Sequence, residues 1–261
     1  MSRAKQRFRA RLAMVAVAAA LALTGCESDD PVFPAPEGPP PPPASFYPLS
    51  SGNQWRYDLT FALRIQDEET GDLILSDTLR AEGAARLIGT ESFDGREYQV
   101  EEFVVSQDGS TDTTWTRLRQ DTTGLYMADL SSRLRPFIEH GGTVAPPEEL
   151  VRLRYPLSTG ATWLIYGGVD SMVATVEALD TIGVSSGRTE AFRIKVDLPY
   201  ARPDDWRRVW YGRCGRIRFA WHREVVAIDV GTGKQSRVIT EEAEALTAVD
   251  LVEPGGCKLT P

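Results

Sequence analysis

The sequence predicts an all-β protein built from antiparallel sheets, with little helix. Short runs in which apolar and polar residues alternate dominate the chain between residues 54 and 240, and such alternation is typical of strands. Turn signals that contain glycine separate the runs, as expected for hairpins. A motif that begins at Tyr47 recurs at Tyr155. This recurrence indicates two tandem copies of one β-module of about 100 residues.

Residues 1–25 have the features of a signal peptide. Basic residues without any acid precede the apolar run Leu12–Leu23, which is shorter than the roughly 20 residues of a membrane-spanning helix. The run Leu23-Thr24-Gly25-Cys26 then resembles a bacterial lipoprotein signal. The resemblance implies that Cys26 is lipidated (palmitate among its acyl chains) and that several chains give a durable membrane anchor. The alternative is an ordinary secretory signal in which the cysteine is a coincidence.

The negative net charge of the chain argues against a nucleic acid partner. The formal charge of the chain is −8, and removal of the five basic residues of the signal brings it to about −13. Nucleic acid binding requires clusters of Lys and Arg, so we expect no nucleic acid partner. The expected location is the cell envelope, with the protein anchored at the outer membrane, on its periplasmic or surface face.

Residues 26–45 are expected to form a tether. They follow the lipidated cysteine and contain few large apolar side chains and a run of prolines, Pro39–Pro43. Such a segment cannot bury enough surface to fold and favours polyproline II, which rises about 3.1 Å per residue. Pro31–Ala44 could therefore hold the folded part roughly 40 Å from the lipid.

The repeated motif defines the modules. The sequence YPLSSGNQWRY of Tyr47–Tyr57 matches YPLSTGATW of Tyr155–Trp163. We expect module copies at residues 46–128 and 151–253, a connector at 129–150 and a tail at 254–261. The motif resembles the opening of a loose group of poorly characterised bacterial lipoproteins, in which aromatic-Pro-Leu-x-x-Gly-x-x-Trp is often repeated. That resemblance implies no activity and no catalytic residues.

Strands are expected throughout both copies. The runs with alternating polarity are Gln54–Ile65, Asp72–Arg80, Gly83–Gly89, Tyr98–Ser106, Thr113–Arg119, Leu125–Asp129, Ser171–Asp180, Ala191–Leu198, Arg207–Tyr211, Ile217–Trp221, Glu224–Val230 and Ser236–Thr240. One short helix is expected at Ser131–Glu139, and Glu241–Val252 fits either a strand or a helix. The two copies could form half-barrels or sandwiches. Because the connector is short, we expect them to pack together.

Cysteine usage predicts one disulfide bond. Cys214 and Cys257 are the cysteines that remain after Cys26, and an even pair in an exported domain is typically bonded. A redox pair or a metal site is the alternative, although the chain has no CxxC motif.

No catalytic signature is recognisable. The two histidines, His140 and His222, lack a second His or a Cys at ligand spacing, and GxSxG, P-loop and Rossmann patterns are absent. Neighbouring acids such as Asp67-Glu68-Glu69 are more typical of solvated loops than of a glycosidase pair. We therefore expect no catalytic residues, no metal and no cofactor.

A stretch rich in arginine and aromatic residues, Trp206–Arg223, is unusual in so acidic a chain. Strand alternation places Trp206, Arg208 and Trp210 on one face and Arg207 and Tyr211 on the other. These five residues are the candidate binding surface for an anionic glycan or a protein partner. The alternative is a cross-strand ladder in which arginine stems cover aromatic rings.

The function predicted first is a non-enzymatic envelope lipoprotein that binds or scaffolds a protein, glycan or apolar ligand. The second is a carrier or chaperone of lipid, with a cavity between curved sheets. A hydrolase is the least favoured class.

Overall fold

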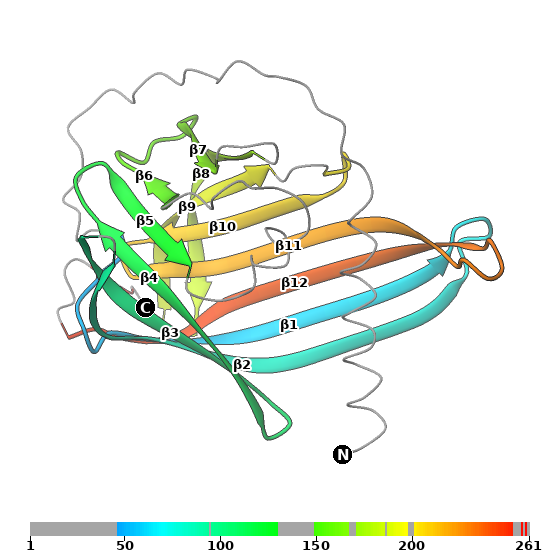
Figure 1. Cartoon of the computed structure of the whole chain (residues 1–261), viewed down its shortest axis with the longest axis horizontal. Coiled ribbons are helices and arrows are strands. Elements are labelled where there is room, and N and C mark those ends of the chain that lie inside the picture. The colour runs from blue at the N-terminus through cyan, green and yellow to red at the C-terminus, as the bar shows by residue number, and fades with distance from the viewer. Residues whose placement is uncertain are drawn as a thin grey trace.

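The computed structural model describes residues 46–129 except 94, together with 149–166, 171–185, 187–197, 201–252, 257 and 259. All regular elements in this part are strands, so the predicted all-β class is confirmed (Figure 1). They are β1 (Gln54–Asp67), β2 (Leu73–Phe93), β3 (Arg96–Gln107), β4 (Ser110–Gln120), β5 (Gly124–Asp129), β6 (Leu150–Arg154), β7 (Thr162–Tyr166), β8 (Met172–Val184), β9 (Gly187–Asp197), β10 (Trp206–Gly212), β11 (Gly215–Ile228) and β12 (Gln235–Asp250).

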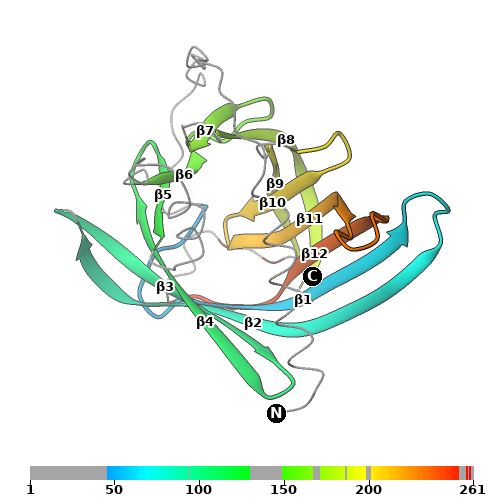
Figure 2. The same ribbon diagram turned by 45° about the vertical axis from the view of Figure 1, so that its right-hand side comes forward.

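The described strands form one antiparallel sheet in the order β6-β5-β4-β3-β2-β1-β12-β11-β10-β9-β8-β7. Each half is a meander of six strands, and β1 joins the halves by pairing with β12. The edge strands β6 and β7 also approach each other, and Trp163 Nε1 donates to the carbonyl of Val151 at 3.0 Å. The sheet therefore curls until it nearly closes on itself, as Figure 2 shows.

Both halves contribute to a single core on the inner face of the sheet. Trp55 and Leu118 of the first half and Ile194 and Ile217 of the second are almost fully buried in one cluster. Close packing of this kind makes the two halves one folding unit. The expectation that the copies pack together is confirmed.

Strand positions agree well with the alternation pattern, but two pairs of predicted runs are each continuous. The paired runs predicted at 72–80 and 83–89, and at 217–221 and 224–230, each form a single long strand, β2 and β11. Gly83 lies inside β2, where an added Cβ would be 3.1 Å from the Phe103 ring and 3.2 Å from Leu59. This glycine therefore permits close packing instead of ending the strand.

Three further expectations concern segments at the ends of modules. The ambiguous segment 241–252 continues as strand through Asp250. Residues 150–154 form β6, which pairs with β5 of the first half, although 151–154 were expected in the second copy. The helix expected at Ser131–Glu139, His140, Cys26 and the tether lie outside the described residues.

The two copies of the repeated motif form the same turn. Gly52 and Gly160 have φ of +94° and +87°, a region that strongly favours glycine. In each turn the N–H of the next residue donates to a serine carbonyl, from Asn53 to Ser50 at 3.1 Å and from Ala161 to Ser158 at 3.0 Å. The glycine N–H donates in turn to Leu87 in the first copy and to Val176 in the second.

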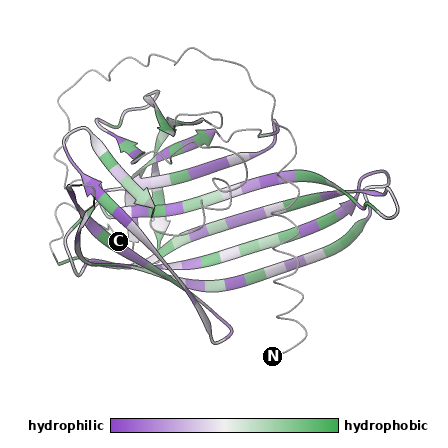
Figure 3. Ribbon diagram, viewed as in Figure 1, coloured by the Kyte–Doolittle hydropathy of each residue, from purple (hydrophilic) through white to green (hydrophobic). Residues whose placement is uncertain are grey.

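The halves of the sheet meet at two seams, one between β1 and β12 and the other between β6 and β7. The strands at the first seam and beside it are much longer than those at the second. Their outer parts, residues 61–67, 73–79, 222–228 and 235–241, extend beyond the rest of the sheet in Figure 1, and we call them the wing. Hydrophobic and hydrophilic residues alternate along the wing strands in Figure 3. Phe61 and Leu63 lie on the same face as Trp55 and Tyr57 but are only half-buried.

Cys214 and Cys257 form the disulfide bond that the cysteine count predicts, with an S–S distance of 2.01 Å. The bond ties the C-terminal tail to the turn between β10 and β11. The carbonyl of Cys214 also accepts a hydrogen bond of 2.6 Å from Trp55 Nε1. The bond therefore stabilises the part of the core where the first copy of the motif meets the second half of the sheet.

Candidate functional site

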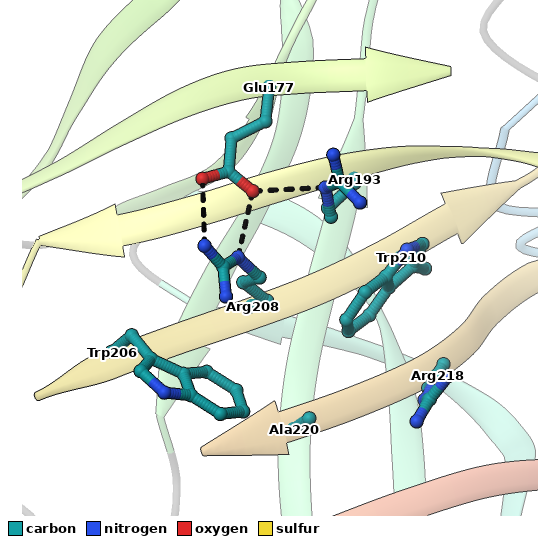
Figure 4. Close-up of a pocket in the computed structure, with 7 residues that line it drawn as sticks. All are labelled: Glu177, Arg193, Trp206, Arg208, Trp210, Arg218 and Ala220. Atoms are coloured by element: carbon teal, nitrogen blue, oxygen red, sulfur yellow. Dashed lines mark hydrogen bonds and ion pairs between the residues drawn. The ribbon is translucent and has the colours of Figure 1, made fainter. Parts of the chain in front are cut away.

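The outer face of strands β8 to β11 carries the candidate site. Trp206, Arg208 and Trp210 point outward from β10, because side chains on a strand alternate between its faces and Tyr211 packs inward against Tyr47. With Glu177 of β8, Arg193 of β9, and Arg218 and Ala220 of β11, they line a hollow of about 440 Å³ (Figure 4). We call this set of seven residues the Trp/Arg face.

Ion pairs hold two of its arginines. Arg208 donates to both carboxylate oxygens of Glu177, at 2.8 and 3.2 Å, and Arg193 approaches the same carboxylate at 3.0 Å. Asp180 receives Arg193 at 3.2 Å and the indole N–H of Trp210 at 2.8 Å. Arg193, Arg208 and Trp210 are therefore held in place before any ligand arrives, which lowers the entropic cost of binding.

The aromatic rings are stacked with cations. The guanidinium of Arg208 lies 5.1 Å from the Trp206 ring centre, and that of Arg218 lies 5.2 Å from Trp210. The other neighbour of Trp206 is His222, stacked at 6.0 Å. Trp210 is buried, whereas Trp206 is half-buried. The face thus combines a cation–π ladder with an open hollow, so both interpretations of the sequence describe part of it.

Positive charge is in excess on this face. Arg193 and Arg208 share the carboxylates of Glu177 and Asp180. Within the described part of the chain, no carboxylate lies within ion-pair distance of the exposed Arg218. A cation that is solvated and stacked but has no paired acid can accept an anionic group from a ligand at little desolvation cost.

The other two predicted residues, Arg207 and Tyr211, point to the inner face. Arg207 stacks 5.3 Å from the Phe219 ring, and burial lowers its pKa. The hydroxyl of Tyr211 accepts a hydrogen bond of 2.5 Å from Arg152 Nε. The structure thus divides the five candidate residues between two faces: Trp206, Arg208 and Trp210 lie together on the outer face, where Trp206 and Arg208 are half-buried and Trp210 is buried.

A buried polar cluster on the inner face has no counterpart in the sequence predictions. The hydroxyl of Tyr47 donates to the Glu101 carboxylate, Arg152 lies 3.8 Å from Glu101, and Arg216 lies 3.0 Å from Glu244. Burial raises the pKa of Tyr47. Alternation does not predict this cluster, because Tyr47 precedes β1, a register shift beside Arg216 reverses its face, and the contacts join segments far apart in the sequence.

This buried cluster is best explained by a structural role and not a catalytic one. Each of its two acids has a tyrosine or arginine partner, which satisfies charges that would otherwise be costly inside the core. Paired carboxylates of this kind differ from the free acid and base that a glycosidase places across a cleft.

In the described ranges, no three His, Cys, Asp or Glu residues gather into a potential metal site. His222 Nδ1 lies 3.2 Å from Glu241 on the outer face. The described residues also contain no helix that is long and apolar enough to span a bilayer.

Comparison with known proteins gives weak similarities. No protein-family model matches the chain, and no curated protein matches it significantly. One solved structure, of a Bacteroides fragilis protein thought to be exported and assigned a YmcC-like fold, aligns with a TM-score of 0.40 at 14% identity. It covers 80% of this chain and 100% of that one. A second, of a Parabacteroides distasonis protein thought to be a lipoprotein, gives 0.34 at 12% identity and covers 79% and 99%.

Proposed function

We propose that this protein is a lipid-anchored protein of the cell envelope with a non-enzymatic binding role. The basic N-terminus, the short apolar run and Cys26 support the anchor, and the proline-rich tether would hold the sheet away from the membrane. The hollow of the Trp/Arg face supports the binding role.

The ligand that this face suits best is an anionic glycan. Tryptophan rings offer apolar surface to sugar rings, and arginines bind carboxylate or phosphate groups with directional hydrogen bonds. The observation that carries the proposal is the exposed Arg218 beside two tryptophans in a chain that is otherwise strongly acidic. Long-range charge repels an anionic ligand from most of the surface, so the ligand would concentrate here.

Calorimetric titration of the mature protein in detergent tests the proposal. The probes are a uronic-acid hexasaccharide and a neutral hexasaccharide. We expect Arg218→Gln and Trp206→Ala each to raise the Kd for the acidic probe about tenfold, or about 1.4 kcal/mol. Trp115→Ala is the matched control, because Trp115 is 44% exposed and has the same Trp-x-Arg spacing on β4.

Two results would contradict the assignment. Unchanged binding by Arg218→Gln and Trp206→Ala would place the ligand elsewhere on the molecule. Failure of the acidic probe to bind better than the neutral one would exclude recognition by charge on this face.

A lipid carrier is the second candidate, and one observation favours it. The inward-facing side chains Leu59, Phe61, Leu63 and Ile65 of β1 are only half-buried, so the inner side of the wing offers apolar surface. Lipid extraction and mass spectrometry of the purified protein would test this candidate. Protein free of stoichiometric lipid would count against it.

A further inference from the structure

The far end of the wing carries exposed apolar side chains in and beside two neighbouring hairpin turns. One turn joins β1 to β2, the other joins β11 to β12, and they lie together at the right-hand end in Figure 1. Leu73 and Ile74 are each 58% exposed, Ile228 is 60% exposed and Val230 is 99% exposed. We call these four residues the apolar tip. Exposed aliphatic side chains are unfavourable in water, and several of them at one end of a molecule commonly mark an interaction site.

The backbone beneath the tip is fixed. The carboxylate of Asp67 accepts hydrogen bonds from the N–H groups of Glu69 and Thr70, both at 3.0 Å. Asp229 accepts equivalent bonds from Gly231 and Thr232, at 2.8 and 3.0 Å. In each turn the aspartate at its start therefore fixes the backbone through an Asx turn, which favours one conformation.

The two turns are also bonded to each other. The N–H of Glu68 donates to the Gln235 carbonyl at 3.2 Å, Lys234 lies 3.0 Å from Asp67 and Arg237 lies 3.1 Å from Glu68. These bonds neutralise the nearest acids with the nearest bases. The tip therefore presents a rigid apolar end whose adjoining ion pairs carry little net charge.

From this arrangement we propose that the apolar tip inserts shallowly into the surface of a lipid bilayer, and this inference rests on the proposed lipid anchor. The tip spans four strands, or about 14 Å at the spacing of a sheet. A stable protein partner usually covers about 800 Å² on each side, which a convex end of this width cannot offer. A bilayer requires no complementary shape, and a tether of roughly 40 Å would keep the tip within reach of one.

The remaining charges predict which lipids are preferred. Glu69 and Asp72 are exposed beside the tip, so anionic headgroups would repel it at low ionic strength. We expect stronger insertion into phosphatidylcholine vesicles than into vesicles that contain phosphatidylglycerol. The difference should shrink in 1 M salt, because screening then acts over about 3 Å.

Spin-label accessibility in the lipidated full chain tests the inference. A nitroxide at Val230→Cys reports the tip, and one at Ile88→Cys, which is 48% exposed on the far half of β2, serves as control. The introduced cysteine is the free thiol, since Cys214 and Cys257 are bonded and lipid occupies Cys26. On phosphatidylcholine vesicles we expect the label at 230 to shift from accessibility to a water-soluble nickel complex toward accessibility to oxygen. The label at 88 should remain aqueous.

The outcomes separate the tip from the anchor. Protein that floats with the vesicles while the label at 230 stays aqueous overturns the insertion but leaves the anchor intact. Protein that does not float overturns both. A label that stays aqueous on lipid but is immobilised by added envelope proteins would assign the tip to a protein partner, and the lipid inference would be wrong.

Discussion

The repeated motif begins both seams of the sheet with almost the same sequence, but the strands that follow it differ greatly in length. At each seam the repeated motif forms a turn with the same glycine conformation and closely similar backbone hydrogen bonds. At one seam β1 has 14 residues and β12 has 16, whereas β6 and β7 at the other have five residues each. The motif therefore specifies how a seam begins, and the strand lengths beyond it decide whether the seam becomes a wing or an edge.

The largest effect should come from the motif tryptophans. Trp55 is fully buried, stacks with Tyr47 at 5.4 Å and donates to the Cys214 carbonyl, while Trp163 is 2% exposed and donates to Val151. Because both lose a large buried ring, Trp55→Ala and Trp163→Ala should each cost about 3–5 kcal/mol of unfolding free energy. Urea unfolding followed by circular dichroism measures this. If either substitution lowers the unfolding free energy by less than about 1 kcal/mol, that tryptophan does not contribute to the core.

Removing the disulfide bond should weaken the long seam. The bond closes a loop of 43 residues, and the chain-entropy model gives about 3–4 kcal/mol for such a loop. We expect Cys214→Ser combined with Cys257→Ser to lower the unfolding free energy by this amount. Hydrogen exchange should show faster opening near Trp55 than near Trp163. Equal acceleration at both would show that the bond stabilises the whole sheet and not one seam.

The motif glycines provide a matched pair of substitutions. Both Gly52 and Gly160 have positive φ, so alanine should cost about 1–2 kcal/mol at either position. At Gly52 the added Cβ would also meet Val252 Cγ2 at 3.0 Å, whereas at Gly160 nothing lies within 4 Å. Gly52→Ala should therefore lower the thermal midpoint more than Gly160→Ala. A larger decrease for Gly160→Ala would mean that the cost of the positive φ outweighs the contact with Val252.

The smallest effect concerns pH at the end of the wing. The backbone N–H of Thr70 and the ammonium group of Lys234 lower the pKa of Asp67 from 3.8 to about 2. Because the folded-state pKa is the lower one, the contribution is complete above pH 3.8 and is lost as the pH falls through 2. Carbon-13 NMR of the carboxyl group should show this midpoint, and Lys234→Gln should raise it only partly. A midpoint near 3.8 would mean that the turn is not formed.

Local sequence patterns predicted much of the fold. Alternation located the strands because one face of each is buried, and the copies of the motif located two turns at equivalent places. The candidate site was only partly predictable. Alternation separates Trp206, Arg208 and Trp210 from Arg207 and Tyr211, but it cannot tell which face points outward. Glu177, Arg193 and Arg218 come from three other strands, and no local pattern brings them together.

By itself, the sequence determined the all-β class, the turns, the even pair of cysteines and the acidic charge. These properties depend on neighbours in the chain, where side-chain period and glycine conformation act directly. Only the tertiary structure decided that β1 pairs with β12, that the halves share one core and that the wing ends in an apolar tip. These features depend on contacts between residues far apart in the sequence, which only the folded backbone brings within reach.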